Sequence, residues 1–364
     1  MNKLTSLYLD LLRILAAFCV VLVHANLSCI SDGKFLHESY GHKMVMVFFV
    51  LSGYLVAYTT DIKKKDLPHY LIDRFSRLYS VVFPALIFTY MIDNIGSYFN
   101  PVFYEGQLAQ NGQWWRALIN LTFLQQNWFL CTKPSANGTF WSIAYELWYY
   151  ILFGIYFYIT NTSKRIWLLI ACILFIGIKI TLLLPVWAMG VFAYQLNKKQ
   201  RLNHIVAIFG FVITLLLIIY LYTQNPISIF ENLFPFGLPP LYFSSRFVSD
   251  YLYGLLIAIN IYFIASISFN CVFEFDENYF IVKIIRHLSS TTFTLYLFHL
   301  PLLLLTAAII PYDHGNYFHL LLILIAIFLI IWILSIFIEP TRIYYKKLLM
   351  EFFVKLKLIA NEKF

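Results

Sequence analysis

The first apolar segment of the chain carries a basic residue and a histidine at a spacing that suits one face of a helix. In LDLLRILAAFCVVLVHA, Arg13 and His24 are eleven residues apart. Eleven residues make almost three helical turns and an axial rise of roughly 16 Å, so both side chains point the same way at different depths. A neutral imidazole suits the removal of a proton near pH 7, and we predict that His24 is a catalytic base. The alternative is that His24 is a packed, hydrogen-bonded residue and that Arg13 only extends its charge to a polar surface.

A carboxylate stands in a later apolar segment at a depth that matches His24. In FWSIAYELWYYILF, Glu146 lies about six residues, roughly 9 Å, from the start of the segment. A carboxylate beside an imidazole is the arrangement that a general base and its partner need. We therefore predict catalytic roles for both His24 and Glu146, with a purely structural pair as the alternative.

Two arginines precede the third apolar segment in RFSRLY. Arg74 and Arg77 are three residues apart and are therefore neighbours on one helical face. Guanidinium groups bind phosphate through forked hydrogen bonds, so Arg74 and Arg77 would suit an anion site for phosphates, with Arg13 as a third basic residue near the inner mouth. The excess of basic residues on the inner side of membrane proteins would explain the same arginines without a ligand. Asp10 and Glu339 are predicted to form structural ion pairs, Glu339 with one of these three arginines.

Other small or polar residues in the apolar segments could either pack the helices together or line a path for a substrate. Ser52 and Gly53, in VFFVLSGYLVA, would either allow close helix packing or line a substrate path. His299, in TLYLFHLPLL, precedes Pro301 and is either structural or functional. The residues predicted to line a substrate path are Ser52, Gly53, Trp141, Ser142, Tyr296 and His299.

The chain that carries these residues is too apolar to fold as a water-facing globule. Of its 364 residues, 61% are hydrophobic and 12% are charged, and the mean hydropathy is +0.75. Soluble domains are about 45–50% apolar and about 25% charged. The apolar residues also form long blocks, and a helix needs roughly 20 of them to cross a bilayer. We predict an all-α, polytopic membrane helix bundle with about ten transmembrane helices in contact with the lipid bilayer.

Ten segments are predicted to span the bilayer, and Trp114 to Leu124 is predicted to be re-entrant or interfacial. The fifth and sixth spans are the shortest and are separated by a break from Lys179 to Pro185. The predicted spans are 7–28, 44–60, 79–93, 140–160, 165–180, 181–196, 204–222, 247–268, 288–310 and 317–338.

The basic residues predict the orientation of these spans. With the N-terminus inside, nineteen Lys and Arg residues lie in inner loops and the tail, and five lie outside. This asymmetry follows the positive-inside rule and predicts that both termini are cytoplasmic. It also explains the net charge of +8 without a nucleic acid partner.

The chain is predicted to have a transmembrane domain at 1–340 and a basic amphipathic cytoplasmic tail at 341–364. The five cysteines follow no metal-binding spacing, and we predict no metal. Cys29 and Cys131 both fall on the predicted outer side, and the sequence leaves open whether they pair.

The ordered set of motifs resembles the acyltransferase 3 family of membrane acyltransferases. Arg13 and His24 match its first helix, VFFVLSGYL its second, RFSRLY its paired arginines, and FWSIAYELWYY its helix with a glutamate. TLYLFHLP and FIEP resemble its late helices, so the matches extend from residue 9 to residue 340. Before FFV, where the family is often glycine-rich, this chain has only Gly41 in GHKMVMVFFV.

The resemblance implies a fold of ten helices and an activity. It implies an O-acyltransferase of the bacterial inner membrane that binds no permanent cofactor and uses acyl-CoA, most often acetyl-CoA, as its donor. The acceptor would be a hydroxyl of a cell-surface glycan, such as lipopolysaccharide or exopolysaccharide, or its lipid-linked precursor. Arg13, Arg74 and Arg77 would hold the coenzyme phosphates inside, and the thioester would reach His24 and Glu146.

Two other interpretations stay open. In another type of membrane acyltransferase, His299 would be the main catalyst. A transporter or flippase for a glycan or small anion would also use intramembrane Arg, His and Glu residues. The sequence shows no repeated halves of the kind that many transporters have. It specifies neither the acceptor sugar nor the acyl chain length nor the oligomeric state, and it does not tell whether a covalent intermediate forms.

Overall fold

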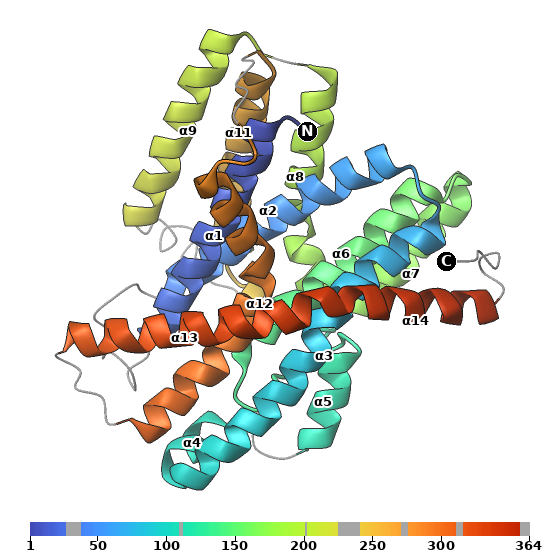
Figure 1. Cartoon of the computed structure of the whole chain (residues 1–364). Coiled ribbons are helices and arrows are strands. Elements are labelled where there is room, and N and C mark those ends of the chain that lie inside the picture. Colours follow the sequence, from blue (N-terminus) through green and yellow to red (C-terminus); the bar gives the residue numbers. More distant parts are fainter. Residues whose placement is uncertain are drawn as a thin grey trace. The chain divides into compact units, whose positions relative to one another are not determined.

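The computed structural model of the protein describes residues 1–26, 38–108, 112–200, 202–224, 241–270, 276–310 and 316–356. Over these residues every regular element is a helix (Figure 1), so the predicted all-α fold class is confirmed. The open question of whether Cys29 pairs with Cys131 involves Cys29, which lies outside the described residues.

A helix coincides with each of the ten predicted spans. In the described part of the chain, eight helices have the length and apolar composition of a membrane span. The helices α6 and α7 are not among them, and α7, with 15 residues, is shorter than the roughly 20 residues that a full crossing needs. The ten are α1 (Lys3–Ala25), α2 (Glu38–Lys63), α3 (Leu67–Phe99), α6 (Trp141–Tyr158), α7 (Thr162–Ile176), α8 (Ile178–Lys199), α9 (His204–Gln224), α11 (Phe247–Asn270), α12 (Phe280–Ile309) and α13 (Tyr317–Ile338).

Shorter elements connect or extend these helices. The segment predicted to be re-entrant or interfacial overlaps α5, and the predicted tail contains α14, which follows α13 closely in Figure 1. The shorter elements are α4 (Pro101–Gln107), α5 (Gln113–Leu121), η1 (Gly138–Phe140), η2 (Tyr242–Ser244), η3 (Glu339–Thr341) and α14 (Arg342–Lys355).

The break between the fifth and sixth spans lies earlier than predicted. The helix α7 ends at Ile176 and α8 begins at Ile178, so Lys179 and Pro185 both lie inside α8. The break is at Gly177, whose φ of 83° is in the left-handed region that favours glycine. A Cβ there would lie 2.9 Å from the Trp128 ring. Proline is tolerated inside membrane helices because neighbouring groups bind the carbonyl that it frees.

The chain divides into two compact units. Unit 1 comprises Met1–Val20, His37–Lys63 and Lys179–Thr292, and unit 2 comprises Val21–Leu36, Lys64–Ile178 and Phe293–Phe364. The helices α1 and α12 contribute residues to both units, because the division falls within each of them.

In unit 1, α2 and α8 pack with their backbones in close approach. A Cβ on Gly53 would lie 2.0 Å from Trp187 O, and a Cβ on Gly190 would lie 2.0 Å from Val50 O. Ser52 Oγ also accepts a hydrogen bond from Trp187 Nε1 at 3.2 Å. Small residues commonly permit this approach in membranes, and the geometry favours the packing interpretation of Ser52 and Gly53.

In unit 2, α3 is the element against which α4, α5, α6 and α14 pack. Its first turn contains a proline and is capped by Asp66, whose side chain accepts a hydrogen bond from His69 N. Asp73, further along α3, binds Lys65 Nζ at 2.6 Å and Lys346 Nζ at 3.1 Å. The ion pair with Lys346 attaches α14 to α3, and the two helices lie side by side in Figure 1.

Candidate active site

Three polar side chains of unit 2 share one face of α6. Ser142, Glu146 and Tyr150 follow each other at four-residue intervals, so they lie one above another on the helix. The hydroxyls of Ser142 and Tyr296, on α12, are hydrogen-bonded at 2.9 Å. Tyr150 donates a hydrogen bond to Glu146. This face therefore presents a run of hydroxyl and carboxyl groups toward α12 and α3.

At one end of this run, the two intramembrane histidines are hydrogen-bonded to each other. His24 Nδ1 lies 2.8 Å from His299 Nε2, and His299 Nδ1 lies 2.9 Å from Leu295 O. A carbonyl oxygen only accepts hydrogen bonds, so His299 Nδ1 carries the hydrogen and its Nε2 is an acceptor when the ring is neutral. His24 Nδ1 must then donate, so a neutral His24 ring carries its lone pair on Nε2.

The exposure of the two rings agrees with this assignment. His299 is completely buried, whereas His24 is partly exposed. A ring that accepts a proton from a substrate must be reachable, and a ring that orients it need not be. The geometry therefore supports His24 as the base and His299 as the residue that positions it, in the relation of base and orienting group known from catalytic triads.

At the other end of the run, arginines from two helices approach the carboxylates. Arg77 lies within electrostatic range of Glu146, Tyr150 and Glu339. Glu339 accepts a hydrogen bond from Thr294 Oγ1 at 2.7 Å. Glu339 lies within electrostatic range of Arg77, and its role in a structural ion pair stays a prediction.

Two further arginines lie near Arg77. The Arg74 guanidinium lies over the rings of Tyr70 and Tyr150, 5.2 and 5.5 Å from their centroids. Arg342, at the start of α14, donates a hydrogen bond to Asp73 O at 3.4 Å and lies within electrostatic range of both Arg74 and Arg77. Three guanidinium groups therefore gather in unit 2, within electrostatic range of the carboxylates of Glu146, Glu339 and Asp73.

The arginines and the histidines are joined by one continuous set of polar side chains, here called the polar column. Thr294, at the level of Glu339, and His299 are five residues apart on α12, an axial rise of about 7.5 Å. A ligand with anionic groups at the arginines could thus place a less polar part beside His24. The polar column consists of Arg77, Glu339, Tyr150, Glu146, Ser142, Tyr296, His299 and His24.

The predicted residues in unit 1 have partners of their own. Asp10 accepts hydrogen bonds from Arg286 and from Ser289 Oγ, the latter at 2.7 Å, and lies 3.6 Å from Arg13. This is the geometry expected of the predicted ion pair of Asp10. Arg13 and His24 lie on the single helix α1, as their spacing predicts, with Arg13 in unit 1 and His24 in unit 2.

An asparagine that the sequence did not single out supports the segment around His299. Pro301 has no N–H to bond to the carbonyl four residues earlier in α12, which is that of Leu297. Asn137, which is completely buried, donates to this carbonyl at 2.9 Å and to Thr89 Oγ1 at 3.1 Å. Its side-chain oxygen accepts from Thr139 and caps η1, just before α6. Asn137 thereby links α3, α6 and α12 next to the histidine pair.

The described residues contain no group of three or more His, Cys, Asp or Glu side chains that could hold a metal ion. The site is therefore built from hydroxyl, carboxyl, imidazole and guanidinium groups on apolar helices. Together, fold and site define a polytopic helical membrane protein with a polar column inside unit 2.

The comparison with protein families identifies this class more closely. The chain matches the acyltransferase 3 family model, described as an acyltransferase domain, over residues 6–338 of 364. The match covers most of the chain, and the protein belongs to this family of acyltransferases. It is thus a multi-pass membrane acyltransferase. No curated protein and no solved structure matches the chain.

Proposed function

We propose that this membrane acyltransferase moves an acyl group, most simply acetyl, from a coenzyme A thioester to a hydroxyl of a cell-surface glycan or its lipid-linked precursor. The observation that carries the proposal is the histidine pair, because the Leu295 carbonyl and His299 leave His24 Nε2 as an unprotonated nitrogen. A hydroxyl attacking a thioester needs such a base, since its proton must leave as the new bond forms.

In the proposed reaction, His24 Nε2 takes the proton of the acceptor hydroxyl while its oxygen attacks the thioester carbonyl carbon. The tetrahedral intermediate then collapses as the carbon–sulfur bond breaks, and the thiolate of coenzyme A receives the proton from the imidazolium. The products are an ester and the free thiol, so neither an oxidant nor a metal is required. His299 Nε2 accepts from His24 Nδ1–H throughout and keeps the ring in position.

The donor would bind through its phosphates at the inner end of the polar column. Arg74 and Arg77 were expected in this role from the sequence, and the position of Arg342 beside both supports its addition to the set. Guanidinium groups at a protein surface provide forked hydrogen bonds to phosphate oxygens. The slender arm that carries the thioester would then extend along Ser142 and Tyr296 toward His24.

Glu146 would act on the electrostatics of the site rather than on the attacking hydroxyl directly. Its carboxylate accepts from Tyr150 and lies within electrostatic range of Arg77 and Tyr296. A negative charge at this level stabilises an imidazolium formed at His24 during the reaction. We place the enzyme in the bacterial inner membrane, where donor and acceptor approach from opposite sides.

The direct test combines purified protein with intact cells. The full chain in phosphatidylcholine nanodiscs should release free thiol from acetyl-CoA when a surface glycan from the source cells is added. The glycans of cells with and without the protein should differ in mass by one acyl group. Transport of a glycan across vesicles without any consumption of acetyl-CoA would instead establish a transporter.

A further inference from the structure

A long groove runs along α3 in unit 2, outside the polar column. Its volume is about 730 Å³, and it is lined by α3, α5 and the segments near Leu108 and Ser135. The lining residues of α3 begin at Phe83 and end at Ser97, an axial length of about 21 Å. A groove of this length suits an extended ligand better than a compact one.

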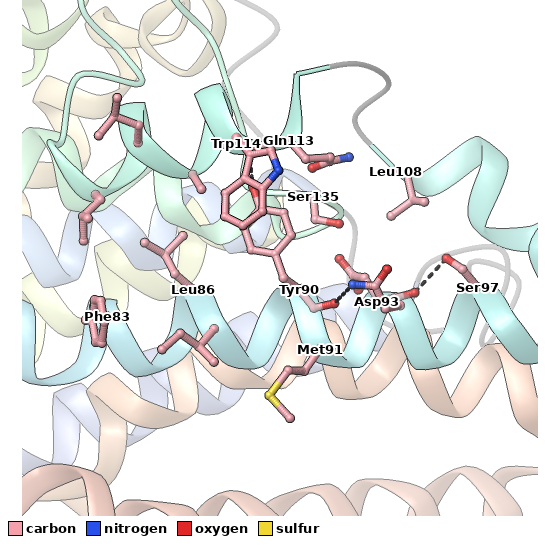
Figure 2. A pocket seen from close by; sticks show the side chains of 15 residues that line it. Phe83, Leu86, Tyr90, Met91, Asp93, Ser97, Leu108, Gln113, Trp114 and Ser135 are labelled. Carbon is pink, nitrogen blue, oxygen red and sulfur yellow. Dashed lines mark hydrogen bonds between the residues drawn. The ribbon is translucent and has the colours of Figure 1, made fainter.

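The polarity of the groove changes along its length. The hydroxyl of Tyr90 donates to Gln113 O at 3.0 Å and that of Tyr79 to Leu121 O at 3.2 Å, so α5 runs antiparallel to α3. The C-terminal half of α5 therefore lines the same end of the groove as Phe83. In Figure 2, Phe83 and Leu86 lie toward one end, whereas Asp93, Ser97, Ser135 and Gln113 gather toward the other. One end is thus apolar and the other is rich in hydrogen-bonding groups.

The polar end holds a buried carboxylate with unused hydrogen-bonding capacity. Asp93 is 2% exposed, its Oδ2 accepts from Ala136 N at 2.9 Å, and the Ser135 side chain also hydrogen-bonds to its carboxylate. Its Oδ1 has no hydrogen-bond partner among the described residues. A buried acceptor without a partner is costly, and a hydroxylated ligand in the groove would satisfy it. Trp114, 91% exposed at the same end, offers a flat face of the kind that sugar rings pack against.

The groove adjoins the segment that carries the histidine pair. Thr89, one turn before Asp93 on α3, accepts a hydrogen bond from Asn137, which also binds the Leu297 carbonyl. The rings of Phe88 and Phe298 pack with their centroids 4.8 Å apart. Leu297 and Phe298 directly precede His299, so a head group bound at Asp93 lies close to the chemistry proposed above.

We propose that this groove binds the acyl acceptor as an amphiphile, with a polyhydroxylated head at Asp93 and Trp114 and an apolar tail along Phe83, Leu86 and Leu118. The proposal rests on the proposed function, since it identifies the acceptor as a lipid-linked sugar rather than a free one. In the topology predicted from the basic residues, the apolar end of α3 lies deeper in the bilayer. The tail would therefore stay in lipid while the head lies at the outer surface.

An ordinary phospholipid is the competing occupant. It would fill the apolar end equally well, but it offers no set of hydroxyls to the Asp93 carboxylate. Lys133 and Arg116 lie within electrostatic range of the polar end, so a phosphate between head and tail is compatible with the groove. Dependence of binding on the Asp93 carboxylate is what separates the two occupants.

The test uses an alkyl glucoside with a photoreactive diazirine in its tail as the probe, added to the full chain in phosphatidylcholine nanodiscs. Peptides of α3 and α5 should be labelled on irradiation, and an unreactive alkyl glucoside should compete, whereas free glucose should not. Asp93→Asn should reduce labelling about tenfold, because a hydrogen bond to a charged group is lost. Trp114→Ala should also reduce it. Trp115→Ala is the matched control, since Trp115 is an exposed neighbour on α5 that does not line the groove.

The outcomes separate this proposal from the proposed function. Labelling that is equal in wild type, Asp93→Asn and Trp114→Ala would mean a phospholipid-filled groove and would overturn the proposal, even if acyl transfer is observed. Labelling that depends on Asp93 and Trp114, in a protein that consumes no acetyl-CoA, would support the binding site while the proposed function fails. Both variants are checked for wild-type melting temperature first, and the exposed Trp114 keeps the test valid if Asp93→Asn fails to fold.

Discussion

The hydrogen bond between the two histidines predicts unequal losses when each is removed. His24→Ala deletes the proposed base, and loss of a general base typically costs about 10²–10⁴ in rate. His299→Ala deletes only the acceptor that orients the base. One net hydrogen bond contributes about 0.5–1.5 kcal/mol, which corresponds to a rate loss of about 2–13-fold. The rate loss in His24→Ala should therefore be about ten or more times the rate loss in His299→Ala.

A conservative variant makes this prediction sharper. In His299→Gln, the side-chain carbonyl oxygen can still accept from His24 Nδ1–H, since it reaches a position similar to that of the lost ring nitrogen. This variant should retain more activity than His299→Ala at equal expression. In the double variant His24→Ala/His299→Ala, the second change should add little, because residues that act as a unit are not additive.

The assay is the release of free thiol from acetyl-CoA by purified protein in nanodiscs with saturating acceptor. Binding of acetyl-CoA, measured separately, should be unchanged in all these variants, because the arginines are untouched. The opposite order of effects, with His24→Ala near wild type and His299→Ala inactive, would refute the tautomer assignment and make His299 the base. That result would favour the other type of membrane acyltransferase considered from the sequence.

Three further predictions concern donor binding and the helix framework. Arg77→Ala should weaken acetyl-CoA binding more than Arg77→Lys in a titration, because lysine keeps the charge but loses the fork; equal affinity in both variants would contradict the phosphate role. Asn137→Ala should cost about 1–3 kcal/mol, since it leaves buried polar groups unpaired, and the loss in melting temperature should shrink in a Pro301→Ala background, where the freed carbonyl regains an N–H donor. Gly190→Ala should lower the melting temperature because its Cβ would lie 2.0 Å from the Val50 carbonyl oxygen, whereas Gly106→Ala, with open space around it, should not. Equal melting temperatures of the two variants would argue against the close packing of α2 and α8.

The positions of the helices along the chain could be predicted from composition and from the lengths of the apolar runs. All ten predicted spans coincide with helices because long apolar runs have few alternatives in a bilayer, where each backbone group must be paired within the segment. The break between α7 and α8 lies at Gly177, whereas the sequence predicts it between Lys179 and Pro185. Inside a membrane helix a proline is tolerated, whereas the φ of 83° at Gly177 ends the helix outright.

The site was predictable only in part. The spacing of Arg13 and His24 is a property of a single segment, so a helical count finds it. The hydrogen bond between His24 and His299 joins residues that are 275 positions apart in the sequence. The periodicity of a single segment cannot predict such a contact. In the sequence Arg342 is only one of many basic residues near the C-terminus, because its approach to Arg74 and Arg77 depends on how α14 packs on α3. The hydrogen bond from Asn137 to the carbonyl that Pro301 frees is likewise visible only in the folded structure.

The proposals place both substrates along one helix. Arg77 and Asp93 are sixteen residues apart on α3, an axial rise of about 24 Å, and the hydrocarbon core of a bilayer is about 30 Å thick. A donor held at Arg77 and an acceptor head held at Asp93 would each enter from its own side, and neither would have to cross the bilayer. Pro84 lies between them, and the Ser80 carbonyl that it frees accepts from Thr341 Oγ1 at 3.4 Å. Thr341 follows Glu339 by two residues in η3, so the segment that lies within electrostatic range of Arg77 also supports the turn of α3 that precedes Pro84. The separation of the two proposed binding sites is therefore set by the length of α3 between Arg77 and Asp93. The histidine pair then acts at the one place where the thioester of the donor and the hydroxyl of the acceptor meet.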